Sequence, residues 1–162
     1  MIGKMKTPPR QHALRTGRIS LADQVYLITT VTRRRAPVFS DLFAGRTLVR
    51  QLQHHHRSGD AETLAYVIMP DHLHWMFRLR AASLSRTVQT LKGASSRAVP
   101  ALTWQAGFHD QALRDERQLK AYARYIVANP LRAGLVDRIG AYPLWDTVWL
   151  QADTEANWDW GG

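Results

Sequence analysis

The spacing of apolar residues along the chain follows two periods, one typical of β-strands and one typical of α-helices. Runs rich in β-branched and aromatic residues at positions 25–32, 63–69 and 72–79 predict three strands. Pro70 and Asp71 lie between the last two runs, where they predict a tight turn and therefore a β-hairpin.

Three helices are predicted between and after these strands. The first begins at a Ser40 or Asp41 cap and ends near Arg57, the second begins near Ser83, and the third covers residues 117–128. Their predicted apolar stripes are Leu42, Phe43, Leu48, Val49 and Leu52 in the first, Leu84, Val88 and Leu91 in the second, and Leu119, Tyr122, Ala123 and Ile126 in the third.

The element order predicts an α+β fold of the ferredoxin-like type, with helices packed on a central, largely antiparallel sheet. Residues 104–109 fit either a further short strand or a loop. His54, His55 and His56 end the first helix. Because consecutive helical residues point about 100° apart, the three histidines predict a polar helix end rather than a shared metal site.

The length of 162 residues suits one domain. Residues 1–18 are basic and contain two prolines, so they are expected to form a mobile arm, and 19–150 to form the domain. Residues 151–162 are expected to form a C-terminal tail.

Charge and cysteine content narrow the classes of function. Lys and Arg number 22 against 13 Asp and Glu, a formal net charge of +9, which favours nucleic acid as partner and an acidic membrane surface second. An ordinary basic protein is the alternative. The absence of cysteine excludes disulfides, thiolate metal sites and a cysteine nucleophile. No apolar run approaches the roughly 18–20 residues of a membrane span, so a cytoplasmic protein is expected.

His72 and His74 are the first candidate site. Residues two apart in a strand project from the same face, so these imidazoles point together while Leu73 and Trp75 face the other way. Such a pair can chelate one ion, although paired strand histidines are more often surface or core residues. A third ligand would have to come from elsewhere in the fold.

The third helix carries two further candidates. Tyr125 falls off the apolar stripe, and Asn129 lies four residues on at the same flank, a placement that suits a nucleophile and an oxygen ligand. Tyr122 is better explained as core. Amphipathic packing of Tyr125 and a capping role for Asn129 before Pro130 are the alternatives.

Several segments together resemble a known family. The chain resembles the REP-associated tyrosine transposases, within the IS200-like, single-tyrosine HUH nucleases. The family tail usually reads Tyr-Pro-Trp-Ser-Ser, whereas residues 142–146 read Tyr-Pro-Leu-Trp-Asp. The segments that carry the resemblance are residues 26–32, 66–75, 104–110, 112–114, 123–136 and 142–143.

The resemblance implies an HUH nuclease fold and an active site. It implies that His72 and His74 are metal ligands, that Tyr125 is the nucleophile, and that Asn129 is the third ligand. The implied reaction leaves a 5′-phosphotyrosine and a free 3′-hydroxyl, with Mg²⁺ or Mn²⁺ as cofactor. Imidazole-rich sites generally prefer zinc, nickel or copper, so a purified sample can carry another transition metal.

The resemblance also implies a partner, single-stranded or hairpin DNA with palindromic repeats, and favours a monomer over a homodimer. Arg124 is a weak candidate for the basic neighbour that activates Tyr125. Phe108 is expected in the core. The alternatives are a non-catalytic repeat-DNA-binding regulatory protein and a phosphodiesterase that uses water. Candidate DNA contacts are Arg33, Arg34, Arg35, Arg86, Lys92, Arg97, Trp104 and Arg124.

Overall fold

The computed structural model describes residues 10–11, 23–81 and 83–150. Its centre is a six-stranded sheet with the order β1-β5-β2-β4-β3-β6, in which every neighbouring pair is antiparallel. This confirms the predicted α+β fold with an antiparallel sheet. The strands are β1 (Arg10–Gln11), β2 (Val25–Val31), β3 (Ala61–Met69), β4 (His72–Leu79), β5 (His109–Leu113) and β6 (Trp145–Thr147).

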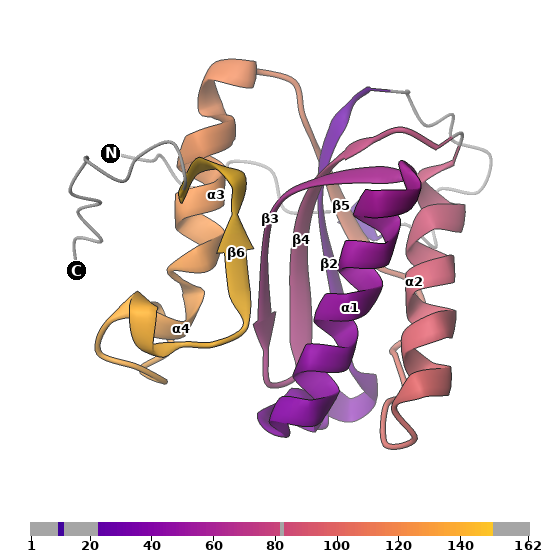
Figure 1. Cartoon of the computed structure of the whole chain (residues 1–162), viewed down its shortest axis with the longest axis vertical. Coiled ribbons are helices and arrows are strands. Elements are labelled where there is room, and N and C mark those ends of the chain that lie inside the picture. The colour runs from indigo at the N-terminus through magenta and orange to yellow at the C-terminus, as the bar shows by residue number, and fades with distance from the viewer. Residues whose placement is uncertain (1–9, 12–22, 82, 151–162) are drawn as a thin grey trace.

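Helices cover both faces of the sheet (Figure 1). Helices α1 (Leu42–Ser58) and α2 (Leu84–Ala98) pack together on one face. Helix α3 (Leu119–Val127), followed by the short α4 (Asn129–Arg132), packs on the other. The sheet therefore separates two apolar cores. None of the helices in the described ranges is long and apolar enough to cross a membrane.

Helix α1 begins where the sequence predicts. The Asp41 side chain accepts a hydrogen bond from the Phe43 backbone N–H at 2.9 Å. The helix ends at Gly59, whose φ of 82° lies in the left-handed region that glycine adopts without strain.

The predicted apolar stripe of α1 is wrong at its first turn. Leu42 and Phe43 are 40% and 63% exposed, whereas Leu48 and Leu52 are buried. At about 100° per residue, Leu42 and Phe43 lie roughly 120–140° around the helix from Leu48, so they point to solvent. The inward position at this end is taken by Phe39, in the preceding turn.

The prediction of a polar helix end is wrong for one of the three histidines. His55 is 2% exposed, and its ring centroid lies 5.9 Å from that of Trp75. Burial lowers its pKa, while Asp60, 3.6 Å from Nδ1, acts in the opposite direction. His54 and His56 are exposed, as expected. His55 is therefore a core residue on the α1 stripe.

The sequence pattern did not predict where the shorter strands lie. Trp104 makes only an isolated bridge to Thr32, and the strand in this region, β5, begins later at His109. Strand β1 lies within the predicted N-terminal arm and pairs with β5. The other residues of the arm that precede position 19, and the predicted tail 151–162, lie outside the described residues.

Strand β4 serves both faces of the sheet. Leu73, Trp75 and Phe77 belong to the core beneath α1 and α2. Met76 belongs to the core beneath α3, and the alternation of strand side chains places His72 and His74 on the same side as Met76. The histidine pair therefore lies on the face of the sheet that α3 covers.

Candidate active site

The two candidate ligands lie side by side at the start of β4. His72 follows the Pro70-Asp71 turn directly, and the ring centroids of His72 and His74 are 4.8 Å apart in an edge-on arrangement. The alternation of the strand places both imidazoles on one face, as predicted from their spacing.

A carboxylate fixes the orientation of His72. The Nδ1–H of His72 donates to Asp71 Oδ1 at 2.6 Å, and Asp71 Oδ2 accepts from Arg35 Nη1 at 3.1 Å. Burial on its own would raise the pKa of Asp71, but the hydrogen bonds from His72 and Arg35 outweigh it and hold the pKa below its ordinary value. The ionised carboxylate keeps the proton of His72 on Nδ1, which leaves Nε2 with a free lone pair.

His74 is held from the neighbouring strand. Its Nδ1 lies 2.8 Å from the hydroxyl of Thr29, which stands directly opposite on β2. Burial, together with the neighbouring His72 and Arg132, lowers the pKa of His74 to about 3. His74 is therefore neutral at physiological pH, the form that binds a metal ion.

A cavity of about 100 Å³ connects His74 to α3 and α4. The structure thus brings together His74, Tyr125 and Asn129, which come from segments about fifty residues apart, and the His72 ring adjoins them through its contact with His74. The residues that line the cavity are Leu27, Thr29, His74, Gln111, Tyr125, Ile126, Asn129 and Arg132.

Tyr125 lies at the mouth of this cavity. It is 42% exposed, while its neighbour Ile126 is 1% exposed and anchors α3 in the core. The guanidinium carbon of Arg132 lies 3.9 Å from the centroid of the Tyr125 ring. Arg132 was not among the residues predicted from the sequence, since its approach to Tyr125 depends on the turn into α4.

The donor atoms of the cavity fit a divalent cation. The described residues contain no cluster of three or more His, Cys, Asp or Glu side chains, and the oxygen donors beside the imidazoles include side-chain amides. Asn129 and Gln111 both line the cavity. The Gln111 Oε1 atom is buried and has no hydrogen-bond partner among the described residues, which marks an unused acceptor.

Comparison with known proteins identifies the family. Residues 20–129 match the family model described as "Transposase IS200 like". The chain belongs to this family. No curated protein matches the chain.

A solved structure shares the fold of this IS200-like transposase. A REP-associated tyrosine transposase bound to a REP hairpin is similar at 22% identity and a TM-score of 0.72, over 90% of this chain and 89% of that one. A protein of Deinococcus radiodurans R1 assigned as a transposase is 23% identical, over 70% of this chain and 95% of that one, with a TM-score of 0.48.

The arginine turn of the transposase stands at the same end of the sheet as His72. Arg33, Arg34 and Arg35 are exposed, as a DNA contact requires, and Arg35 is bound to Asp71. Arg34 and Arg35 have φ angles of 56° and 52°, a left-handed conformation that costs energy in residues other than glycine.

Helix α2 carries predicted DNA contacts of two kinds. Arg86 and Arg97 are exposed. Lys92 instead donates to the carbonyl oxygens of Gln105 and Gly107 at 2.8 and 2.7 Å, and burial lowers its pKa to about 8. Its ammonium group therefore holds a loop of the transposase in place.

The aromatic candidates are also used inside the fold. Trp104 donates from Nε1 to Ser95 Oγ at 3.0 Å, and its ring centroid lies 5.6 Å from that of Phe39. Phe108 is buried, as predicted. Arg124 is partly buried on α3 and does not line the cavity that holds Tyr125. These contacts leave the exposed arginines as the stronger candidates for contact with DNA.

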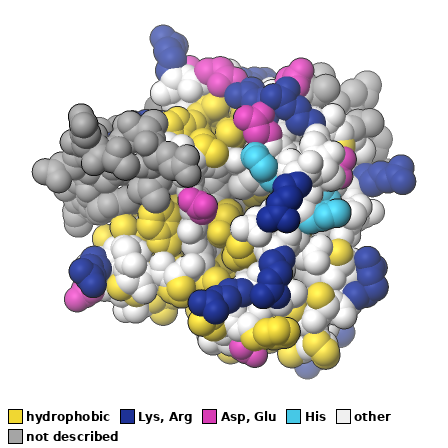
Figure 2. Space-filling model, viewed as in Figure 1, with side chains coloured by type: hydrophobic (Ala, Val, Ile, Leu, Met, Phe, Trp, Pro, Cys, Tyr) yellow, Lys and Arg dark blue, Asp and Glu magenta, His cyan; other side chains and the backbone are white. Residues whose placement is uncertain are grey.

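A basic stripe on α1 was missed by sequence reasoning. Arg46, Arg50 and Arg57 are exposed on this helix, and Figure 2 shows basic side chains gathered over it. The four-residue spacing of Arg46 and Arg50 was the available signal. Because α1 covers the face of the sheet opposite to α3, this stripe lies away from the histidine pair.

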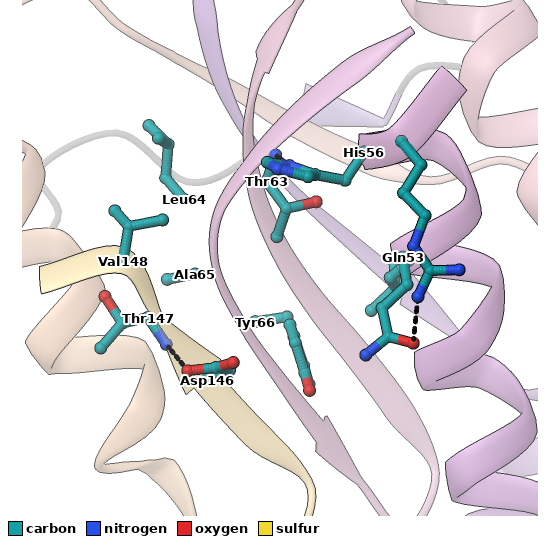
Figure 3. Close-up of a pocket in the computed structure, with 11 residues that line it drawn as sticks. Gln53, His56, Thr63, Leu64, Ala65, Tyr66, Asp146, Thr147 and Val148 are labelled. Carbon is teal, nitrogen blue, oxygen red and sulfur yellow. Dashed lines mark hydrogen bonds between the residues drawn. The ribbon is translucent and has the colours of Figure 1, made fainter. Parts of the chain in front are cut away.

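A larger cavity of about 270 Å³ lies between α1, β3 and β6 (Figure 3). Its tyrosine, Tyr66, has its pKa raised to about 12 by burial and by Asp146. The ring of His56, on the α1 side, accepts a hydrogen bond at Nδ1 from the backbone N–H of Thr63. Since its tyrosine is held in the protonated form, the smaller cavity is the better candidate for the active site of the transposase.

Proposed function

We propose that the chain is a metal-dependent tyrosine transposase of the REP-associated branch. It cuts single-stranded DNA next to hairpin-forming palindromic repeats, and the protein becomes covalently joined to the cut end. The observation that carries this proposal is the cavity that unites His74, Tyr125 and Asn129 beside His72. The similar fold of a transposase bound to a REP hairpin supports the choice of DNA.

The reaction is a transesterification at phosphorus. The Tyr125 oxygen forms a bond to phosphorus as the bond from phosphorus to the 3′ oxygen breaks. The phenolic proton passes to solvent, and the departing 3′ oxygen takes up a proton. The product is a 5′-phosphotyrosine, which conserves the energy of the broken ester, so a second 3′-hydroxyl reverses the step without ATP.

His72, His74 and Asn129 would hold the cation, Mg²⁺ or Mn²⁺. A divalent ion bound there supplies Lewis-acid polarisation of a phosphate oxygen. Asp71 and Thr29 orient the two imidazoles, and the buried Ile126 fixes the helix that carries Tyr125. A protonated phenol is a poor nucleophile, so activation within the cavity is required.

The wider function follows from the same proposal. The exposed arginine turn of Arg33, Arg34 and Arg35 contacts the phosphate backbone beside the site. The protein acts as a monomer in the cytoplasm.

The covalent intermediate provides the test. Purified protein is incubated with Mn²⁺ and a radiolabelled single-stranded oligonucleotide that contains a hairpin, then separated on a denaturing protein gel. A labelled protein band is expected from the wild type and none from Tyr125→Phe. Tyr122→Phe is the matched control, because Tyr122 lies one turn earlier on α3 and packs against the core.

Two outcomes would contradict the proposal. Cleavage that persists in Tyr125→Phe without a labelled band would show a phosphodiesterase that uses water. Tight binding of the hairpin without cleavage, across a series of divalent metals, would show a non-catalytic repeat-binding protein.

A further inference from the structure

The guanidinium of Arg132 is a cation without a counter-ion in the cavity. None of the carboxylates in the described ranges lies within ion-pair distance of it, whereas Arg35, Arg78, Arg80 and Arg117 all have such partners. Partial burial lowers the pKa of Arg132, while Tyr125 acts in the opposite direction. The residue is exposed at the rim of the cavity, so its unpaired charge is accessible to an anion that enters from solution.

The turn into α4 fixes where Arg132 lies. The turn is closed by the Ala133 backbone N–H, which donates to the Asn129 carbonyl at 2.9 Å, and Pro130 is buried beneath it. Asn129 and Arg132 are three residues apart, so one helical turn directs both into the same cavity. The side chain of Arg132 is thereby held over the ring of Tyr125.

Arg132 lies close to the candidate nucleophile and in the same cavity as two candidate metal ligands. Its guanidinium carbon is 3.9 Å from the Tyr125 ring centroid, and Arg132 lines the same cavity as His74 and Asn129. An anion held by Arg132 in this cavity would therefore lie near both the candidate nucleophile and the candidate metal ligands His74 and Asn129. Of the DNA groups that reach a site of this kind, only the phosphate carries the required charge.

We infer that Arg132 binds the scissile phosphate and stabilises the charge that develops on its non-bridging oxygens as Tyr125 attacks. This inference rests on the proposed function and assigns a further catalytic residue to it. Guanidinium groups suit this task because their N–H donors bind two oxygens of one phosphate, and they remain charged throughout. Arg132 transfers no proton: it donates hydrogen bonds while the bond from phosphorus to Tyr125 forms and the bond to the 3′ oxygen breaks.

The alternative to this inference is a packing role, in which Arg132 only covers the Tyr125 ring. The two roles differ in what an added cation can repair. A small guanidinium ion can occupy the space left by Arg132→Ala and restore charge stabilisation, but it cannot restore a packing contact that positions α3. Lysine, which offers a point charge instead of a planar fork, should restore only part of the activity.

The test uses the full chain, saturating hairpin DNA and Mn²⁺. The rate of labelled adduct formation is measured in a single turnover for the wild type, Arg132→Ala, Arg132→Lys and Arg138→Ala, each with and without guanidinium chloride at low millimolar concentration. Arg138 is the control because it is an exposed arginine outside the cavity. Thermal melting of each variant is recorded beside the rate.

The adduct rate of Arg132→Ala is expected to fall on the order of 10²–10³-fold, while its melting temperature stays unchanged. Guanidinium should restore part of this rate. The loss in Arg132→Ala should be larger than any loss in Arg138→Ala. An adduct rate within about twofold of the wild type, or a loss that guanidinium does not repair, overturns the inference. If the wild type itself forms no adduct, the proposed function fails instead, so the two failures are distinguishable.

Discussion

Each imidazole of the candidate site is held through Nδ1 and leaves Nε2 open. Asp71 holds His72 and Thr29 holds His74, so both rings are oriented before any ion binds, and the Asp71 carboxylate also keeps the proton of His72 on Nδ1. Spacing and family resemblance named His72, His74, Tyr125 and Asn129, and the structure places the last three around one cavity with His72 beside His74, while their roles stay predictions. Spacing and resemblance could not predict Thr29 or Arg132, because those contacts depend on the register of β2 against β4 and on the turn into α4.

Removal of the Asp71 carboxylate should weaken metal binding. In Asp71→Ala, the Nδ1–H of His72 loses its acceptor and Arg35 loses its partner, so the ring is free to rotate and its Nε2 is less basic. The affinity for Mn²⁺ is expected to fall about 10–100-fold, measured by isothermal titration of metal-free protein.

Asp137→Ala is the matched control for this measurement, because it removes an exposed aspartate that does not line the cavity. Equal Mn²⁺ affinity in Asp71→Ala and the wild type would show that Asp71 does not orient a ligand.

At the scale of elements, long periodic segments were predictable and short ones were not. Helices α1 and α2 carry side-chain caps at Asp41 and Ser83, and the hairpin of β3 and β4 has its turn at Pro70-Asp71. Strands β1 and β6 contain two and three residues, too few to display a period, and exist because they pair with β5 and β3. Phe43 is apolar, but its angle around α1 places it outside the buried stripe, so its side chain is exposed.

The end of α1 allows a test of element stability. Gly59 has a φ of 82° and open space around its α-carbon, so Gly59→Ala introduces backbone strain without a steric clash. The free energy of unfolding is expected to fall by about 1 kcal/mol in urea titrations. Gly140→Ala, at a position with equally open space and no left-handed φ, serves as the control. No difference between the two variants would contradict this explanation of the helix end.

At the scale of the whole molecule, exposed basic residues of the described ranges lie on two sides of the sheet. The arginine turn lies beside His72, while Arg46, Arg50 and Arg57 follow α1 on the opposite side of the sheet. The composition could not predict this distribution, because it gives the total charge and not where the charged side chains lie. It indicates that binding at the site depends on a small subset of the basic residues.

Salt dependence should reveal that subset. The logarithm of the DNA affinity falls with the logarithm of salt concentration, and each phosphate contact to a single strand contributes about 0.7 to the slope. Replacement of both Arg33 and Arg34 by Gln is expected to reduce the slope by about 1.4, measured by fluorescence anisotropy across a series of NaCl concentrations. Arg117→Gln, whose charge is already offset by Asp115, should leave the slope unchanged. An unaltered slope in the double variant would exclude the arginine turn from the interface.

The stability of the whole fold should depend on pH through His55. Its pKa in the folded protein lies below the ordinary value of 6.5, because burial disfavours the charged form. The unfolded chain therefore takes up a proton first, and the free energy of unfolding decreases as pH falls below about 6.5.

Urea titrations at about pH 7.5 and about pH 5.5 measure this decrease. In His55→Leu the decrease should be smaller than in the wild type, while His74, which has a lowered pKa in both proteins, contributes equally to each. An identical decrease in the two proteins would contradict the assignment to His55.

The two-sided use of β4 has a consequence for how the protein tolerates changes in its gene. Substitution of His72 or His74 alters one face of the strand and leaves Leu73, Trp75 and Phe77 in their core, so chemistry can be lost while the fold persists. Deletion of one residue within the strand exchanges the two faces, bringing imidazoles into the core and a tryptophan into the cavity. Point mutations can thus yield a folded protein without chemistry, but a single-codon deletion in this strand removes fold and chemistry together.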